Sequence, residues 1–518
     1  MNAGGPDVIV IGAGSSGCVV AARLAAQSRT RVMVLEAGPE ADNRASALNN
    51  PNYWALLNND SLRKRYFWSG LQARPSPGRP KVDYLRGFGL GGSSTVNAMT
   101  AVRGECEAFD TWAGHGASGW SFDDLLPSII RVEHDLDFSE ANYHGNAGPI
   151  PVKRTPLDEW SALDKALLDS ALKLGYPWID DVNAPHSTGV SSYPGNIQYG
   201  KRVSAYDGYL KPVRHRENVD VRTDSLVERV LFAGARTTGV ELVTGETIDA
   251  QEVIVCAGAI HSPALLQRSG IGPPTVLAEI GAAVVAPRPG VGANLFDHAY
   301  VGASLALAPA HARRRPTLRP LNCCVRYSSG IAGGCRNDML IHSEYRHGAS
   351  PTGIDDGGID VWLVQPFSRG RTQARSRHAT DEPDIDLELL SDERDMHRLR
   401  DGWRRLVQLC AQPAFKQITD TPWAGAYDRK MDELANASDA LLDAWIKDHV
   451  LDLAHAMGTC RMGAANDSHA VVDSTCNVIG VDGLRVIDAS IIPEDPRANI
   501  NLTVMAIAEH AMTLNRPR

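Results

Sequence analysis

Several features that would place this 518-residue chain in a special class of protein are missing. No run approaches the ~18 consecutive apolar residues that a membrane-spanning helix needs. The nine cysteines are odd in number and none is spaced as CxxC, which favours free thiols in a reducing cytosol over disulfides or a zinc site. The formal net charge of −9 argues against a nucleic-acid-binding surface. We therefore expect neither a membrane nor a nucleic-acid partner.

The N-terminal segment "MNAGGPDVIVIGAG" also lacks the basic start and the longer apolar stretch of a secretory signal. Its apolar run is better interpreted as a first β-strand. Hydrophobic residues make up 43% of the chain and charged residues 22%, which is typical of a soluble globular protein. We expect a cytoplasmic protein, either a monomer or a homodimer.

A glycine-rich turn follows the first predicted strand, Val8 to Ile11. Gly12, Gly14 and Gly17 form a GxGxxG pattern that leads into the helical stretch "CVVAARLAAQ". Such glycines permit a tight turn, close approach of a pyrophosphate and close helix packing, while the helix N-terminus offers N–H groups to phosphates. Glu36 ends the second predicted strand, where a carboxylate can accept hydrogen bonds from ribose hydroxyls. The pattern predicts a dinucleotide, NAD or FAD, and argues against NADP.

The apolar pattern changes twice along the chain. Short apolar strands and helical stretches occupy both ends, as in "EVIVCAGAI" and "NLTVMAIAEHAMTLN". Between about residues 303 and 385 the apolar runs often alternate with polar residues, in "NCCVRYSS", "NDMLIHSEYR", "IDVWLVQPFS" and "PDIDLELL", and predict an antiparallel sheet. The predicted fold class is α/β with α+β elements. A Rossmann-like domain of residues 1–150, 195–300 and 445–518 would carry an inserted substrate domain of residues 151–194 and 301–444.

The run "HAMGTCRMG", His455 to Gly463, admits three interpretations. It could hold a Cys–His nucleophile pair, a metal site, or a lone base beside a cofactor. A nucleophilic cysteine needs a base in reach and a lowered pKa, and a turn of small residues does not guarantee contact between Cys460 and His455. No carboxylate or second histidine stands at ligand spacing, so no metal is expected. A lone histidine outside any motif would most often be a packed core residue.

Stretches along nearly the whole chain resemble the glucose–methanol–choline (GMC) oxidoreductase family. They are "IGAGSSGCVVAARL…VLEAG", "GFGLGGSSTVNAMTAVRG", "GAIHSPALLQRSGIG" and "HAMGTCRMG…VVD…GLRVIDASIIP…NINLTVMAIAEHA". Because these stretches occur in the family's order, the chain is identified as a member of that family. The resemblance implies a Rossmann-like FAD-binding domain, and it implies FAD instead of NAD.

The resemblance also implies which residues meet the cofactor. Asn97 can hydrogen-bond polar atoms of the cofactor or can simply form a turn. Asp488 and Ala489 would meet the pyrophosphate or the ribityl chain, with helix capping as the alternative for Asp488. Some family members link the flavin to a histidine at the position of Val96, so non-covalent FAD is expected. The expected cofactor-binding set is Gly12, Gly14, Ser15, Ser16, Gly17, Glu36, Ala37, Gly92, Ser93, Asn97, Met99, Val227, Ala257, Gly258, Asp488, Ala489, Asn499 and Asn501.

By the same resemblance His455 is the general base and Asn501, in "NIN", is its partner. Oxidising an alcohol removes the hydroxyl proton while a hydride leaves the adjacent carbon for flavin N5. Histidine suits the first task because its ordinary pKa of about 6.5 lies near working pH. Asn501 can hold the substrate oxygen. Cys460 then belongs to a structural segment. The other histidines considered, expected in packing or surface roles, are His261, His298 and His510.

The predicted reaction is FAD-dependent oxidation of the CH–OH group of a small alcohol to an aldehyde or ketone. Electrons would pass to O₂, giving H₂O₂, or to another carrier; oxidase activity is favoured because the bulk of Leu453 could gate O₂. One alternative is a hydroxynitrile lyase that keeps FAD without net redox. Another is a flavin-binding protein without turnover, against which His455 and Asn501 argue. The substrate stays open: the aromatic residues of "NYWALLNND" and "RYFWSG" could cover a ring or simply pack.

Overall fold

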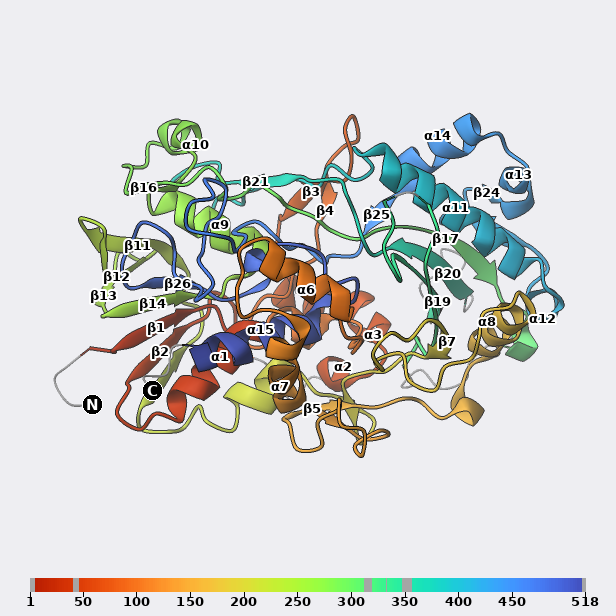
Figure 1. Ribbon diagram of the computed structural model, residues 1–518, viewed down its shortest axis with the longest axis horizontal. Helices are drawn as coiled ribbons and strands as arrows, with labels where there is room; N and C mark the ends of the chain where they lie inside the picture. Colours follow the sequence, from red (N-terminus) through yellow and green to blue (C-terminus); the bar gives the residue numbers. More distant parts are fainter. Residues whose placement is uncertain (1–4, 41–45, 312–318, 332, 347–355, 515–518) are drawn as a thin grey trace.

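The computed structural model describes residues 5–40, 46–311, 319–331, 333–346 and 356–514. Two large sheets organise them. A parallel sheet lies toward one end of the long axis and an antiparallel sheet toward the other, with the first and last parts of the chain meeting around the parallel sheet (Figure 1). The predicted α/β class, a Rossmann-type fold with an inserted antiparallel sheet, is confirmed.

The parallel sheet has five strands in the order β10, β2, β1, β14 and β26. All residues of β1 and β2 are buried, as continuous apolar runs predict for strands covered on both faces. The helix after β1 packs against the C-terminal helix, and both helices form where the sequence predicted them. The bounds are β1 Val8–Ile11, β2 Val32–Leu35, β10 Val219–Arg222, β14 Glu252–Val255, β26 Leu484–Val486, α1 Ser15–Ala25, α7 Phe122–Val132, α9 Gly258–Arg268 and α15 Ile500–Leu514.

The antiparallel sheet has eight strands in the order β24, β23, β17, β20, β19, β18 and β7, with β25 also paired to β17. Three of the four predicted segments form its central strands β18, β19 and β20. The bounds are β7 Gly189–Ser192, β17 Ala299–Ala306, β18 Cys323–Tyr327, β19 Met339–Arg346, β20 Asp356–Leu363, β23 Pro422–Ala424, β24 Arg429–Lys430 and β25 Leu451–Asp452. Its neighbouring helices are α8 Ala162–Lys173, α11 Glu393–Cys410, α12 Pro413–Lys416, α13 Met431–Ala435 and α14 Asp439–His449.

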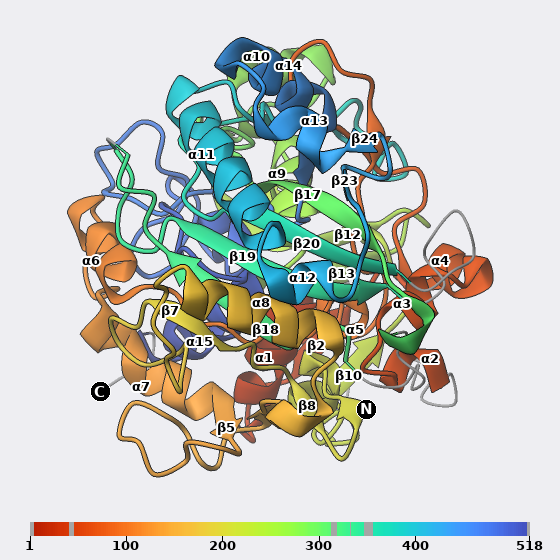
Figure 2. The ribbon, with the colours of Figure 1, turned by 90° about the vertical axis from the view of Figure 1, so that its right-hand side faces the viewer.

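The two faces of this sheet differ because side chains alternate along each strand. Helix α11 crosses one face (Figure 2). A Cβ placed on Gly402 of α11 would lie 2.7 Å from Cγ2 of Val361, so the odd-numbered side chains of β20 pack beneath this helix. Even-numbered residues such as Asp360 and Trp362 point the opposite way.

One predicted strand belongs to a different sheet. "PDIDLELL" forms β22, which pairs with β21 and, in parallel, with β3, where Ile385 lies opposite Ala73. The expectation that this segment extends the antiparallel sheet is wrong, because its partner comes from the distant N-terminal part of the chain and local alternation carries no sign of that. The strands of this four-stranded sheet are β3 Gln72–Arg74, β4 Val82–Asp83, β21 Arg371–Gln373 and β22 Asp384–Asp386.

Shorter elements complete the described chain. Ser121 caps α7 with a capping box to Asp124. Among the described helices, none has the length and apolar character needed to cross a bilayer. The remaining helices are α2 Ser46–Asn49, α3 Trp54–Leu57, α4 Asp60–Tyr66, α5 Ser93–Val96, α6 Cys106–Gly114 and α10 Pro274–Glu279. The remaining strands are β5 Glu133–Asp135, β6 Ile150–Val152, β8 Ile197–Gln198, β9 Lys201–Arg202, β11 Val227–Ala233, β12 Arg236–Leu242, β13 Thr247–Asp249, β15 Ile271–Gly272 and β16 Ala286–Pro287.

A buried ion pair joins the antiparallel sheet to the rest of the molecule. Arg326 of β18 lies 2.7 Å from a carboxylate oxygen of Glu105, with both side chains 3% exposed. The same guanidinium donates to backbone carbonyls of Val182, Arg103 and Arg497. Arg326 therefore connects three other segments of the chain to β18.

Replacing Arg326 by Met should lower the free energy of unfolding by about 3–5 kcal/mol, because Glu105 is left buried without its cation. Arg222→Met is the control, since Arg222 pairs with Asp220 and Glu246 at the surface, where such pairs contribute about 0–1 kcal/mol. Denaturant unfolding followed by intrinsic fluorescence measures both variants. Equal losses of unfolding free energy in the two variants would contradict a stabilising role for the buried Arg326–Glu105 pair.

Candidate active site

The predicted cofactor residues come from separate stretches and meet at one edge of the parallel sheet. Gly12 follows β1, Glu36 follows β2, Ala257 follows β14 and Asp488 follows β26. Parallel strands place all these carboxyl ends together. Since β2 and β14 lie on opposite sides of β1, this edge includes the point where strand order reverses, which is where open α/β sheets bind nucleotides.

The glycine-rich turns leave a wall of bare backbone at this edge. Gly12 has φ of +93°, and a Cβ there would lie 2.6 Å from the carbonyl oxygen of Cys256. A Cβ on Gly92, with φ of +50°, would lie 2.8 Å from Cα of Gly14, so the two glycine-rich loops touch. A Cβ on Gly17 would lie 1.9 Å from the oxygen of Gly12, which is the close helix packing that the sequence predicted for this position.

Two acidic residues at the edge bind protein groups. Glu36 accepts from the backbone N–H of Ala13 at 2.8 Å through Oε2, and from those of Gly38 at 2.9 Å and Gly89 at 3.2 Å through Oε1, so Oε2 keeps a further lone pair. Asp488 accepts from the backbone N–H groups of Gly258 and Ser490, both at 2.8 Å, and from two serine hydroxyls. The alternative capping role of Asp488 is therefore present in the structure.

Asn97 also has a turn-forming role. Its side-chain oxygen accepts from the backbone N–H of Met99 at 3.0 Å and from Arg202 at 2.9 Å. Met99 itself is 1% exposed and has φ of +59°. We therefore interpret Met99 as a residue that shapes the turn behind Asn97.

A cavity of about 1290 Å³ begins at the glycine-rich loops and reaches the antiparallel sheet. Its volume exceeds the roughly 300–1,000 Å³ of ordinary ligand pockets, so it can hold a dinucleotide together with a small substrate. Within the predicted set, Gly17 and Met99 do not line it. The predicted residues that do are Gly12, Gly14, Ser15, Ser16, Glu36, Ala37, Gly92, Ser93, Asn97, Val227, Ala257, Gly258, His455, Asp488, Ala489, Asn499 and Asn501. The bare backbone wall, the acidic residue after β2 and the cavity volume together fit FAD.

His455 lies in the cavity wall on a segment held by surrounding polar groups. Its backbone N–H donates to Asp297 at 2.8 Å, and Arg86 donates to the carbonyl of Ala454. Burial lowers the pKa of His455 well below its ordinary value, and the facing His298 and Arg86 lower this pKa further. The imidazole is therefore neutral at neutral pH, which is the form that a base requires.

The nearest polar partner of the His455 ring is His298, whose Nδ1 lies 3.0 Å from Nδ1 of His455. The other nitrogen of His298 lies 2.8 Å from a carboxylate oxygen of Asp495. The expectation of a packing or surface role for His298 misses this contact. His298 and His455 stand 157 positions apart, so sequence spacing gave no sign that they meet. His510 does pack, against Trp120, and His261 stacks on Trp68 at the cavity wall.

Asn501 is attached to the cofactor side of the cavity. Its side-chain oxygen accepts from the hydroxyl of Ser15 in the GxGxxG turn at 2.7 Å. The amide N–H₂ of Asn501 is therefore the group left to donate into the cavity. Asn499, two residues earlier, accepts from the hydroxyl of Tyr193 at 2.9 Å.

Cys460 has none of the properties of a nucleophile. It is 0% exposed, and its backbone N–H donates to the carbonyl of Ser490 at 2.8 Å. Burial and the nearby Asp488 raise the pKa of its thiol well above the ordinary value. The Cys–His interpretation of "HAMGTCRMG" therefore has no structural support.

The even-numbered face of the antiparallel sheet forms the opposite wall of the cavity. The row nearest His455 contains Trp362, whose ring centroid lies 6.2 Å from that of His455, beside Tyr300. The next row on the same face contains Asp360 and His342. It lies two residues further along the strands, a distance of about 7 Å. The face thus changes from aromatic near the predicted base to polar further away.

The polar rows contain buried carboxyl groups, among them those of Glu344 and Asp360. Glu344 accepts from Arg346 at 3.1 Å and from the indole of Trp54 at 3.2 Å. Burial raises the pKa of Glu344 to about 7 and that of Asp360 to about 6, although Arg346 opposes both shifts. The aromatic residues of the two N-terminal stretches line the cavity as well: Tyr53, Trp54, Phe67 and Trp68.

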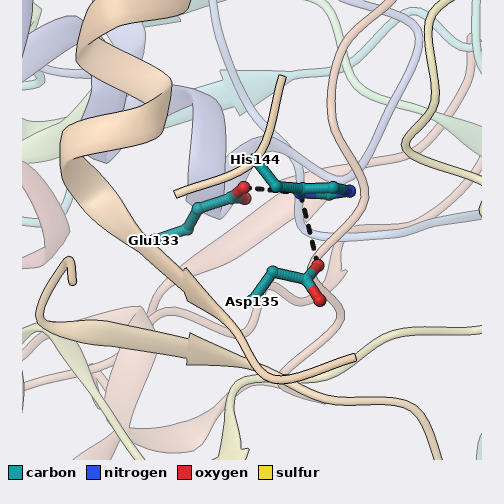
Figure 3. A group of neighbouring side chains, drawn as sticks. All are labelled: Glu133, Asp135 and His144. Carbon is teal, nitrogen blue, oxygen red and sulfur yellow. Dashed lines mark hydrogen bonds and ion pairs between the residues drawn. The ribbon is translucent and has the colours of Figure 1, made fainter. Parts of the chain in front are cut away.

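Within the described parts of the chain, one cluster away from this cavity has the residue types of a metal site. Glu133, Asp135 and His144 point toward one another (Figure 3). Arg154 lies 2.8 Å from a carboxylate oxygen of Asp135, and Arg103 donates to Glu133. Both carboxylates are therefore already paired with arginine side chains. We interpret the cluster as a buried ion-pair network.

The chain matches family models described as GMC oxidoreductase over residues 6–300 and 366–508. It is 35% identical to 5-(hydroxymethyl)furfural oxidase of Methylovorus sp. strain MP688, over 97% of each chain. It is also 35% identical to an oxygen-dependent choline dehydrogenase of Yersinia pseudotuberculosis, over 97% of this chain and 92% of the other. The crystal structure of pyridoxine 4-oxidase from Mesorbium loti superposes with a TM-score of 0.88 at 29% identity, covering 98% and 99% of the two chains.

The chain belongs to the GMC oxidoreductase family. It is an FAD-dependent oxidoreductase acting on alcohols, as the sequence motifs indicated. The relatives named above are oxidases and a dehydrogenase, and they give no support to the lyase alternative.

Gly17→Ala should weaken FAD binding by roughly tenfold or more, equivalent to about 1.4 kcal/mol, because the added methyl displaces α1 from the Gly12 turn. Gly114→Ala is the matched control, since a Cβ at Gly114 meets nothing within 4 Å. The flavin-to-protein ratio after dialysis, and titration of the apoprotein with FAD, measure the effect. Full flavin content in Gly17→Ala would show that the turn tolerates the methyl.

Proposed function

We propose that this protein oxidises the CH–OH group of a small alcohol, with His455 as general base and Asn501 holding the substrate oxygen. The observation that carries the proposal is the position of a neutral His455 in the wall of the same cavity into which the glycine-rich loops open. When bound, FAD supplies the hydride acceptor for the carbinol carbon.

The partners of each side chain support its proposed task. Nδ1 of His455 faces His298, so Nε2 is the nitrogen available to take the hydroxyl proton. The side-chain oxygen of Asn501 is engaged by Ser15, so its amide can donate to the oxygen on which negative charge develops. The ring of Trp362, whose centroid lies 6.2 Å from that of His455, would limit the access of water to the reacting atoms once a substrate is bound.

The remaining proposals concern the cofactor, the organisation of the chain and its surroundings. Val96 lines the cavity without a nucleophilic atom, which supports non-covalent FAD. We assign residues 1–150, 195–300 and 445–518 to the FAD-binding part and residues 151–194 and 301–444 to the substrate-binding part. All nine cysteines are free, which supports a cytoplasmic location. We expect a monomer or a homodimer.

The substrate wall supports an alcohol with two unlike ends. Trp362 and Tyr300 would pack against a flat or apolar carbinol end. Asp360 and Glu344, further along the sheet, would accept hydrogen bonds from donors at the other end. Relatives named for 5-(hydroxymethyl)furfural, choline and pyridoxine supply a suitable first panel.

Anaerobic mixing with this panel should bleach the yellow flavin, and air should restore its colour with one H₂O₂ formed per alcohol oxidised. Bleaching distinguishes oxidation from a lyase reaction, which leaves the flavin oxidised. Stopped-flow reoxidation in air then separates an oxidase from an enzyme that needs another acceptor. Bleaching without peroxide would assign the electrons to a different carrier.

His455→Ala should slow flavin reduction by roughly 10²-fold or more, the usual contribution of a general base. Cys460→Ala is the companion variant: it should lower thermal stability, because Cys460 is fully buried, but leave the reduction rate unchanged. Anaerobic stopped-flow absorbance gives both rates. A Cys460 variant as slow as the His455 variant would restore the Cys–His interpretation.

A further inference from the structure

Three side chains form a line that leads away from the cavity. Nδ1 of His455 lies 3.0 Å from Nδ1 of His298, and Nε2 of His298 lies 2.8 Å from Oδ2 of Asp495. His298 is 0% exposed and Asp495 is 1% exposed, so water cannot replace either contact. The contact with His298 leaves Nε2 of His455 free for the substrate, and Asp495 lies behind His298, away from the cavity.

The direction of each hydrogen bond among Asp495, His298 and His455 determines which nitrogen of His455 carries the proton. A carboxylate can only accept, so Nε2 of His298 must carry a proton toward Asp495. If His298 is neutral, its Nδ1 is then an acceptor, and Nδ1 of His455 must donate to it. That arrangement leaves Nε2 of His455 with a free lone pair. If His298 is instead protonated at both nitrogens, His455 must accept at Nδ1 and keep its proton on Nε2, where it cannot act as a base.

We propose that Asp495 and His298 are positioning residues that fix the Nδ1–H tautomer of His455 and receive its charge during turnover. The proposal rests on the proposed function of His455. As the hydroxyl O–H bond breaks, its proton binds Nε2 of His455. The Nδ1 proton of His455 shifts toward Nδ1 of His298, and the positive charge then lies beside Asp495. One proton is taken up and one is passed on, so the relay needs no further reactant.

The second oxygen of Asp495 determines how an amide would be oriented at this position. Oδ1 accepts from the backbone N–H of Arg497 at 2.6 Å. In Asp495→Asn that position must keep the amide oxygen, so the amide N–H₂ has to face His298. Nε2 of His298 then becomes the acceptor, Nδ1 becomes the donor, and His455 is forced into the tautomer with a protonated Nε2. The substitution thus reverses the relay without changing side-chain size.

The pH dependence of the relay follows from the charged groups around it. Burial lowers the pKa of His298, but Asp495 and Asp297 outweigh it and raise this pKa above the ordinary value. Arg86 faces His455 and lowers its pKa, and Asp452 lies beside Asp297. The pair is inactive while His298 is protonated at both nitrogens, so the rate of flavin reduction should rise with pH as the pair loses this second proton.

The experiment compares wild-type holoenzyme with Asp495→Asn, using whichever alcohol of the three-member panel bleaches the wild-type flavin fastest. Flavin reduction should slow by about 10²-fold, close to the loss expected for His455→Ala, because the histidine is forced into the tautomer that cannot act as a base. The acidic limb of its pH profile should also move to lower pH, because the cation on His298 has lost its carboxylate. A rate and a pH profile like those of the wild type would overturn the proposal.

A second readout needs no alcohol. A histidine with a raised pKa stabilises the folded state fully below its unfolded pKa of about 6.5, and this contribution is lost as pH rises through the folded pKa. The difference in melting temperature between wild type and Asp495→Asn should therefore be largest below that pH and shrink at higher pH. A difference that stays constant with pH contradicts the interaction between Asp495 and His298.

Two further comparisons separate the possible failures. Asp181→Asn is the matched control, because Asp181 bonds His144 at 2.9 Å in the buried ion-pair network and should affect stability but not flavin reduction. If Asp495→Asn fails to fold, His298→Gln can be compared with His298→Leu: a glutamine can still accept from His455, so it should reduce flavin faster, and equal rates overturn the relay. If no alcohol bleaches the wild-type enzyme, the proposed function fails, while the melting comparison still tests the relay.

Discussion

A single buried carboxylate, that of Asp488, holds both halves of the candidate site in place. Its oxygens accept from the start of α9, through Gly258 and Ser262, and from the short turn at Ser490. The carbonyls of residues 489–491 in turn accept from the backbone N–H groups of Gly458, Cys460 and Met462, at 3.2, 2.8 and 2.9 Å. The glycine-rich cofactor edge and the segment that carries His455 therefore share one anchor. Any change that displaced Asp488 would disturb cofactor binding and proton removal together.

Much of the cofactor side could be predicted from the sequence because its signals are local. A short apolar strand, a GxGxxG turn and a helical pattern define α1 and β1 within a few residues, and the carboxyl edge of a parallel sheet follows from strand direction. The cap at Ser121 is local in the same way. Local patterns did not identify FAD as the cofactor or His455 as the base. Both were predicted from the order of the family motifs along the chain.

The rest depends on contacts between residues far apart in sequence. His298 meets His455 only because β17 and the loop after β25 come together, and Asp495 reaches His298 from the start of the C-terminal helix region. The pairing of β22 with β3 is hidden for the same reason. The roles of single polar residues were also ambiguous in sequence: Asn97 and Asp488 line the cavity, yet both accept hydrogen bonds from backbone N–H groups of the protein itself.

The antiparallel sheet places the residues that pack the core and the residues that line the cavity on opposite faces. Side chains such as Val361 on one face pack under α11 and hold the domain together, whereas their neighbours Asp360 and Trp362 on the other face meet the cavity. Because adjacent positions point in opposite directions, a mutation that alters what the cavity recognises need not alter what the core requires. The even-numbered positions of β19 and β20 thus form a surface on which new substrate preferences can evolve while the scaffold stays the same.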